Sequence, residues 1–154
     1  MNKKILIKFY KLRAILFILI AKVIAKIFFV EMPPVVSVAA FIKKDEKILF
    51  LNLTYMKGLG LPGGIIKADE DTETALRREV KEETGLTVTK LDYLWSVSAY
   101  KKISMLCLFF NVEVEGNLKD SEEGDLVWLN PKEAIGKMAY KNVEISLRKF
   151  LELQ

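Results

Sequence analysis

Residues 78–85, with the sequence REVKEETG, place three glutamates within one short segment whose pattern is helical. The segment from 71 to 84 is predicted to form this helix, because Leu76 and Val80 mark an apolar face and Gly85 is a typical C-cap residue. A helix with so much like charge restricts how the chain can fold, since each carboxylate needs water, a cation or a hydrogen-bond donor.

The glutamates are not expected to lie on the side of this helix that faces water. On a helical wheel, at about 100° per residue, Glu79 and Glu83 fall beside the apolar face. The side expected to face water carries five other residues: Thr74, Arg77, Arg78, Lys81 and Thr84. Like charges one turn apart repel, so this pair needs a compensating cation. The helix alone leaves two explanations open, a site for Mg²⁺ or Mn²⁺ and a surface held by salt bridges.

The composition restricts the chemistry of such a site. The chain has 154 residues, of which 51% are hydrophobic and 29% charged, as in a globular domain with a core. Its one cysteine, Cys107, lies in the apolar run MLCLFF and is expected to be a buried strand residue. With one cysteine and no histidine, an intrachain disulfide, zinc sites of the Cys/His type and Ser–His or Cys–His triads are excluded.

The net positive charge of the chain comes from its N-terminal segment alone. The first 34 residues contain seven Lys and Arg and one Glu, a net charge of +6. The remaining residues contain 17 basic and 19 acidic side chains, a net charge of −2. No nucleic-acid partner is therefore expected for the main domain.

Residues 1–34 are predicted to form a separate unit, a basic and apolar helix over 1–30 that ends before two prolines. Five lysines fall on one side of this helix: Lys4, Lys8, Lys11, Lys22 and Lys26. A helix lying in the plane of an anionic membrane surface is the interpretation that we favour. A single membrane span, a cleaved signal peptide, and packing on the domain or on a second subunit in a homodimer are the alternatives.

The remaining chain, 35–154, is predicted to be one domain that mixes strands and helices. Strands are expected at 35–42, 47–53, 87–100, 103–114 and 126–130, and helices at 71–84, from Pro131 and at 143–153. The glycine-rich stretch 57–64 and the polar stretch 117–125 are expected to be loops.

The spacing of residues around the acidic helix resembles that of the Nudix hydrolase family. Gly64 is followed after five residues by Glu70, and after seven more by R-E-V-x-E-E-x-G-L, which ends at Leu86. The resemblance covers residues 35–152 and matches every position of the family's motif, with LPGG immediately before it. It departs from many relatives at Leu59, where these carry Trp. The implied fold is α+β, a Nudix-type α/β/α sandwich with a mixed β-sheet, here preceded by the N-terminal helix.

The resemblance implies an activity, the Mg²⁺-dependent hydrolysis of a phosphoanhydride bond in a nucleoside diphosphate linked to another moiety. Mn²⁺ is the alternative metal, and the substrate is expected to be of the nucleotide type. Two other functions stay open: a non-catalytic Nudix-like module that binds a nucleotide and regulates a partner at the membrane, and action on a non-nucleotide diphosphate. The expected location is cytoplasmic, peripheral on the inner face of the membrane, with a single-span anchor as the alternative.

The resemblance also implies roles for residues of the motif. Glu79, Glu82 and Glu83 look like the metal-binding acids, and the first two are also candidates for catalysis. The loop glycines Gly63 and Gly64 allow a sharp turn. Glu70 and Arg78 resemble a structural ion pair that joins this loop to the helix.

Fewer candidate residues for catalysis, metal binding or substrate contact lie outside the motif. Glu122 and Glu123, in the loop SEEGD, resemble the distant acid that acts as general base or additional metal ligand in several relatives. Lys57, Tyr100 and Lys101 are weaker candidates for contact with the substrate.

Overall fold

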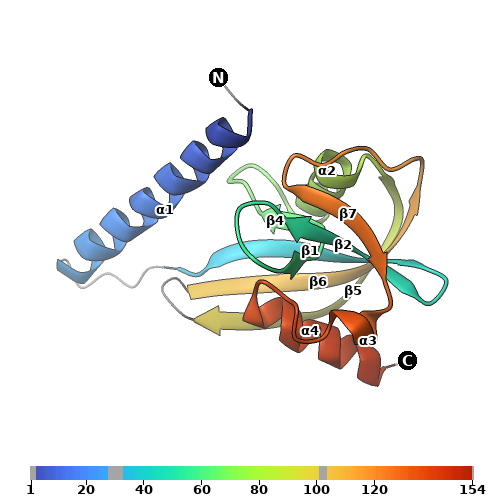
Figure 1. Ribbon diagram of the computed structural model, residues 1–154. Helices are drawn as coiled ribbons and strands as arrows, with labels where there is room; N and C mark the ends of the chain where they lie inside the picture. Colours follow the sequence, from blue (N-terminus) through green and yellow to red (C-terminus); the bar gives the residue numbers. More distant parts are fainter. Residues whose placement is uncertain (1–2, 28–32, 101–103, 154) are drawn as a thin grey trace.

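The computed structural model describes residues 3–27, 33–100 and 104–153 (Figure 1). The helices are α1 (Lys3–Ile27), α2 (Thr72–Thr84), α3 (Pro131–Ala134) and α4 (Lys141–Glu152). The strands are β1 (Val35–Lys44), β2 (Lys47–Leu53), β3 (Leu59–Gly60), β4 (Gly63–Ile65), β5 (Thr87–Tyr100), β6 (Ser104–Glu115) and β7 (Gly124–Leu129).

Strand β1 joins the two parts of the sheet. It pairs in parallel with β6 over its length, and β6 pairs antiparallel with the long strand β5. The first half of β1 also pairs antiparallel with β4, and its end forms a hairpin with β2. Strand β2 in turn pairs antiparallel with β3 and β7. The sheet is therefore mixed, as the resemblance implied.

Successive residues of β1 point to opposite faces of the sheet, and each face is covered by a helix. Val38 and Ala40 are buried in the cluster that contains Leu76 and Val80 of α2. Phe41 is buried in the other cluster, with Leu147 of α4. Figure 1 shows α2 and α4 on the two sides of the strands. The predicted α/β/α sandwich is confirmed, and burial of each large apolar side chain contributes about 1.5–3 kcal/mol to it.

The layer beneath α4 combines aromatic packing with one buried polar contact. The rings of Phe41 and Phe150 stack with their centroids 4.2 Å apart. The indole N–H of Trp95 donates a hydrogen bond to the hydroxyl of Ser146, 2.7 Å away. Cys107 is buried in this layer, as predicted, and burial raises the pKa of its thiol to about 11.

Both ends of α2 are capped, and the C-cap is the predicted Gly85. The carboxylate of Asp71 accepts a hydrogen bond from the backbone N–H of Thr74 at 2.7 Å, so Asp71 is the N-cap rather than the first helical residue. Gly85 has a φ of +76° and closes the helix, its N–H bonded to the carbonyl of Lys81.

The prediction that Thr84 faces water was wrong. Its side chain is fully buried, and its hydroxyl bonds to the carbonyl of Val80 at 2.6 Å and the N–H of Leu86 at 3.1 Å. The reason is tertiary, because the loop before β7 crosses this helix end and the N–H of Lys119 donates to the carbonyl of Thr84.

The expected element boundaries need small corrections. The glycine-rich stretch 57–64 is not wholly a loop, since β3 and the start of β4 lie within it and pair with β2 and β1. Strand β1 extends to Lys44, and the last helix begins at Lys141. Asp45 takes a φ of +55° in the tight turn between β1 and β2.

Helix α1 stands apart from the sandwich (Figure 1). Eight apolar side chains on it are between 41% and 73% exposed: Ile15, Leu16, Phe17, Leu19, Ile20, Val23, Ile24 and Ile27. These eight described side chains are not covered by the domain, as packing of this face on it would require. In the described part of the chain, none of the helices has the length and apolar character needed to cross a membrane.

We expect Ser146→Ala to destabilise the fold by about 1–3 kcal/mol, because it leaves the buried Trp95 N–H without its acceptor. The measurement is urea unfolding followed by Trp fluorescence. Ser96→Ala, at an exposed position of β5, is the matched control and should change the unfolding free energy by less than about 0.5 kcal/mol. Equal stability of the two variants would contradict the role of this contact.

Candidate active site

The fold brings two acidic segments together at one cavity. This cavity, of about 350 Å³, is lined by three glutamates of α2 and by three residues of the loop before β7: Glu79, Glu82, Glu83, Ser121, Glu122 and Glu123. The two segments lie some 40 residues apart in the chain. Every acid that the sequence nominated as metal ligand or base therefore lines the same cavity.

Glu83 is the most deeply buried of these acids, with 7% of its surface exposed. The backbone N–H of Gly63 donates a hydrogen bond to its Oε2 at 2.8 Å. Burial raises the pKa of Glu83 well above its usual range, and the neighbouring charge of Glu123 adds to this increase. The hydrogen bond from Gly63 stabilises the ionised form but does not outweigh these two effects.

Glu79 lies between the guanidinium of Arg78 and the backbone of Gly64. Its carboxylate is 2.7 Å from Nη1 of Arg78 and packs directly over Gly64. Burial raises the pKa of Glu79, although Arg78 acts in the opposite direction. Both acids that the helical wheel placed beside the apolar face are thus removed from bulk water, whereas the side chain of Glu82 is 57% exposed.

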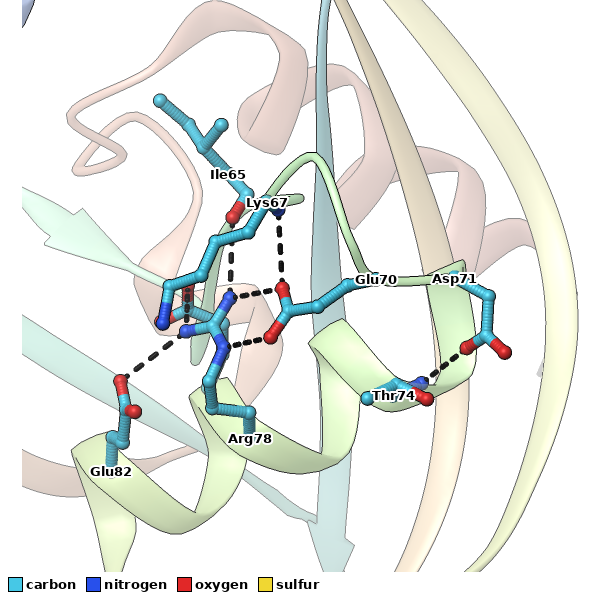
Figure 2. A network of polar contacts seen from close by, with 8 residues as sticks. Ile65, Lys67, Glu70, Asp71, Thr74, Arg78 and Glu82 are labelled. Atoms are coloured by element: carbon cyan, nitrogen blue, oxygen red, sulfur yellow. Dashed lines mark hydrogen bonds and ion pairs between the residues drawn. The ribbon is translucent and has the colours of Figure 1, made fainter.

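Arg78 joins the loop before α2 to the helix (Figure 2). Its guanidinium contacts Glu70 through two pairs of atoms, Nε with Oε1 at 2.5 Å and Nη2 with Oε2 at 2.8 Å. It also donates to the carbonyl of Ile65 and to Glu82, each at 3.3 Å. The hydrogen bond from Arg78 lowers the pKa of Glu70 to about 2. Glu70 additionally accepts from the N–H of Lys67, so the loop is held at both ends.

Two adjacent glycines are required for different reasons. Gly63 has a φ of +150°, and a Cβ there would overlap the carbonyl of Val38 on the paired strand β1. A Cβ on Gly64 would instead overlap the carboxylate of Glu79. Gly63 therefore allows the strand pairing, and Gly64 makes room for an acid of the site.

The two candidate acids outside α2 differ in their surroundings. Glu123 is half-buried, and its charge contributes to the raised pKa of both Glu79 and Glu83. Glu122 lines the same cavity but is exposed. The hydroxyl of Tyr55 donates to Oε2 of Glu123 at 3.4 Å, and burial is the main reason that the pKa of Tyr55 is raised.

Of the three weaker candidates for substrate contact, only Lys57 has a described side chain, and it lies away from this cavity. Lys57 is exposed and lines a second cavity, of about 610 Å³, beside β2, β3 and β7. Tyr100 ends β5 and its side chain is not described, and Lys101 lies outside the described residues. Sequence reasoning missed Tyr55 and Ser121, because neither belongs to a recognisable pattern.

The donor set fits a hard divalent cation. All charged groups that line the cavity are carboxylates, and the two least exposed have raised pKa values that nearby positive charge would reverse. Within the ranges that the structure describes, no three acids are clustered closely enough to form a ready-made cation site. Glu79 lines the cavity but also contacts Arg78, so it would have to share or exchange that contact to act as a ligand.

Comparison with known families settles the classification, because the model of the NUDIX domain matches residues 33–154. The chain belongs to the Nudix family. As a Nudix hydrolase it is an enzyme, and the family binds nucleotide substrates and uses divalent metals.

Individual relatives agree with this assignment. The Nudix chain is 32% identical over 112 residues to a MutT-like protein of Streptomyces ambofaciens, covering 70% of this chain and 72% of that protein. It is 32% identical over 106 residues to the CTP pyrophosphohydrolase of Escherichia coli, covering 64% of this chain and 77% of that protein. The solution structure of the E. coli ORF135 protein superposes with a TM-score of 0.70 at 29% identity, covering 79% of this chain and 91% of that one.

We expect Gly64→Ala to displace the Glu79 carboxylate while the fold is retained, because a flexible side chain can move away from the new Cβ. Mn²⁺ affinity, measured by calorimetry, should fall by about 10- to 100-fold. Gly63→Ala is the comparison: its Cβ meets backbone, so it should lower the unfolding free energy by at least about 1–3 kcal/mol. A folded Gly64→Ala protein with unchanged Mn²⁺ affinity would contradict this role of Gly64.

Proposed function

We propose that this Nudix hydrolase cleaves a phosphoanhydride bond in a nucleoside diphosphate linked to another moiety, with Mg²⁺ as its metal and Mn²⁺ as a substitute. One observation carries the proposal: a cavity in which acids of α2 and of the loop before β7 face one another, with Glu79 and Glu83 largely withdrawn from water. A substrate crowded with phosphate charge cannot approach such acids unless a cation lies between them.

In this proposal the acids of α2 hold the metal. Glu83 is the first ligand, because it is buried and oriented by the N–H of Gly63. Glu79 is the second, and the exposed Glu82 binds directly or through water. When bound, the divalent ion neutralises the diphosphate and lowers the pKa of a coordinated water. Glu70 and Arg78 have a structural role, since their ion pair holds the loop against α2.

The general base is assigned to the loop before β7. Glu123 is favoured over Glu122, since it is half-buried and interacts electrostatically with both Glu79 and Glu83. A carboxylate in this position can accept a proton from a water that attacks the substrate. Glu79 and Glu82 remain the alternative bases within α2.

The first substrates to test are nucleoside triphosphates, with CTP among them, because a relative of similar length is a CTP pyrophosphohydrolase. Dinucleotides, nucleotide sugars and ADP-ribose complete the panel, each with Mg²⁺ and with Mn²⁺. Identification of the products would show which phosphorus is attacked. Tight nucleotide binding without turnover of any substrate would instead favour the non-catalytic regulatory module.

We expect Glu83→Gln to lower turnover of the best substrate by more than about 100-fold. The amide is close in size to the carboxylate and can still accept the hydrogen bond from Gly63, so the protein should remain folded. Glu73→Gln, which changes an exposed acid in the first turn of the same helix, is the matched control and should keep full activity. An unchanged rate for Glu83→Gln would refute its assignment as a ligand.

We also propose that residues 1–30 attach the enzyme to an anionic membrane surface, which keeps the domain on the cytoplasmic side. The support is the exposed apolar surface of α1, where Phe17, Val23 and Ile27 are 60–73% exposed. Lys22 and Lys26, which belong to the predicted stripe of lysines on this helix, provide positive charge for acidic headgroups.

Deletion of residues 1–30 is expected to release the protein from vesicles that contain acidic lipids while leaving hydrolysis intact. Sedimentation with vesicles of neutral and of acidic composition measures the binding. A full-length variant with Phe17→Asp and Val23→Asp controls for the loss of chain length and should bind as weakly as the truncated protein. Equal sedimentation of the intact and truncated proteins would refute the attachment, and a helix that dimerises instead would show as a change in mass by light scattering.

A further inference from the structure

We propose that Tyr55, supported by Tyr140, is a positioning residue that holds the carboxylate of Glu123 in the active-site cavity. The inference rests on the hydrolase function proposed above. It adds a residue from the turn between β2 and β3, which lies outside the motif and outside the acidic loop.

The backbone around Glu123 is attached to this turn. Thr54 donates two hydrogen bonds to the carbonyl of Glu123, from its N–H at 2.9 Å and from its hydroxyl at 3.1 Å. The next residue, Gly124, pairs with Leu53 at the end of β2. A Cβ on Gly124 would overlap the carbonyl of Asn52, so only glycine allows this approach. The position of the acidic loop therefore depends on the end of β2.

The side chain of Glu123 is contacted from the same turn. The hydroxyl of Tyr55 donates to its Oε2 at 3.4 Å and lies 3.3 Å from the hydroxyl of Tyr140, at the start of α4. A phenol has one proton, so when Tyr55 donates to Glu123 it must accept from Tyr140. The three groups then form a directed chain in which each hydrogen bond polarises the next.

The hydrogen bond from Tyr55 to Glu123 counteracts the repulsion among the acids of the cavity. Glu123 shares the cavity with Glu79 and Glu83, and like charges repel there even though its side chain also hydrogen-bonds to that of Glu83. A donor on Oε2 helps to retain the carboxylate of Glu123 in the cavity. The two oxygen–oxygen separations, 3.4 Å to Glu123 and 3.3 Å to Tyr140, are longer than the usual value of about 2.7–2.8 Å. We therefore expect an effect in the range of a single hydrogen bond.

Tyr55→Phe tests the proposal, because it removes the hydroxyl and keeps the ring. We expect kcat to fall by about 2- to 12-fold, the net range for one hydrogen bond, with little change in KM. Tyr140→Phe should give a smaller decrease in kcat, since its hydroxyl acts through Tyr55. Tyr93→Phe removes a hydroxyl from an exposed residue of β5 that packs on Phe110, and it should behave as the wild type.

A double-mutant cycle distinguishes positioning from a general structural effect. If Tyr55 acts through Glu123, then Tyr55→Phe combined with Glu123→Gln should be no slower than Glu123→Gln alone. Additive losses of kcat, a wild-type kcat for Tyr55→Phe, or a loss confined to KM would each overturn the proposal.

Mn²⁺ binding separates the failure of this inference from the failure of the proposed function. If the wild-type protein hydrolyses no substrate of the panel, the proposed function fails. Calorimetry with Mn²⁺ then still tests Tyr55, because the retained charge of Glu123 favours a cation in the cavity. Tyr55→Phe should weaken Mn²⁺ binding by about 2- to 12-fold, and Tyr93→Phe should not. Equal Mn²⁺ affinity for the two variants would overturn the inference.

Discussion

The concentration of negative charge beside the hydrophobic core is the constraint on which the rest of this structure depends. Glu79 and Glu83 lie one helical turn apart and are largely withdrawn from water, an arrangement that destabilises an isolated helix. The fold compensates with the guanidinium of Arg78 on one side and the N–H of Gly63 on the other. The compensation is partial, since burial still raises the pKa of both acids. A divalent cation in the cavity would supply the remaining stabilisation of their negative charge.

The strand pairings of the sheet bring the acidic side chains together at one cavity. Strand β1 pairs with β4 and so sets the glycine loop beneath α2, where Gly63 meets Glu83. Strand β2 pairs with β7 and so brings Glu123 to the same cavity from the far end of the chain. Close contact at both places requires glycine, at Gly63 against β1 and at Gly124 against β2. The site thus lies where the β1–β4 pairing and the β2–β7 pairing come close to α2.

The extent of what could be predicted differs between parts of the molecule. The acidic helix, its C-cap Gly85 and the placement of Glu79 and Glu83 beside the apolar face followed from local patterns that depend on near neighbours in the chain, whereas the N-cap Asp71 was taken as helical. Thr84 was misplaced because a distant loop covers the helix end. The roles of the site residues stay predictions, and Tyr55 was missed because no pattern in LTYMKG indicates that its hydroxyl reaches a glutamate far along the chain.

The sequence by itself indicated the family through the spacing of its motif, and the resemblance implied the mixed α/β/α architecture and the acids that line the cavity, because such spacing encodes helix faces and loop lengths. Only the tertiary structure decided that Glu123 is half-buried and acts on both buried acids whereas Glu122 is exposed, and that Lys57 lines another cavity. Adjacent residues of a loop have the same sequence context. They differ once strand pairing fixes the backbone, here through Thr54 on the carbonyl of Glu123, and places Tyr55 within reach of the Glu123 carboxylate.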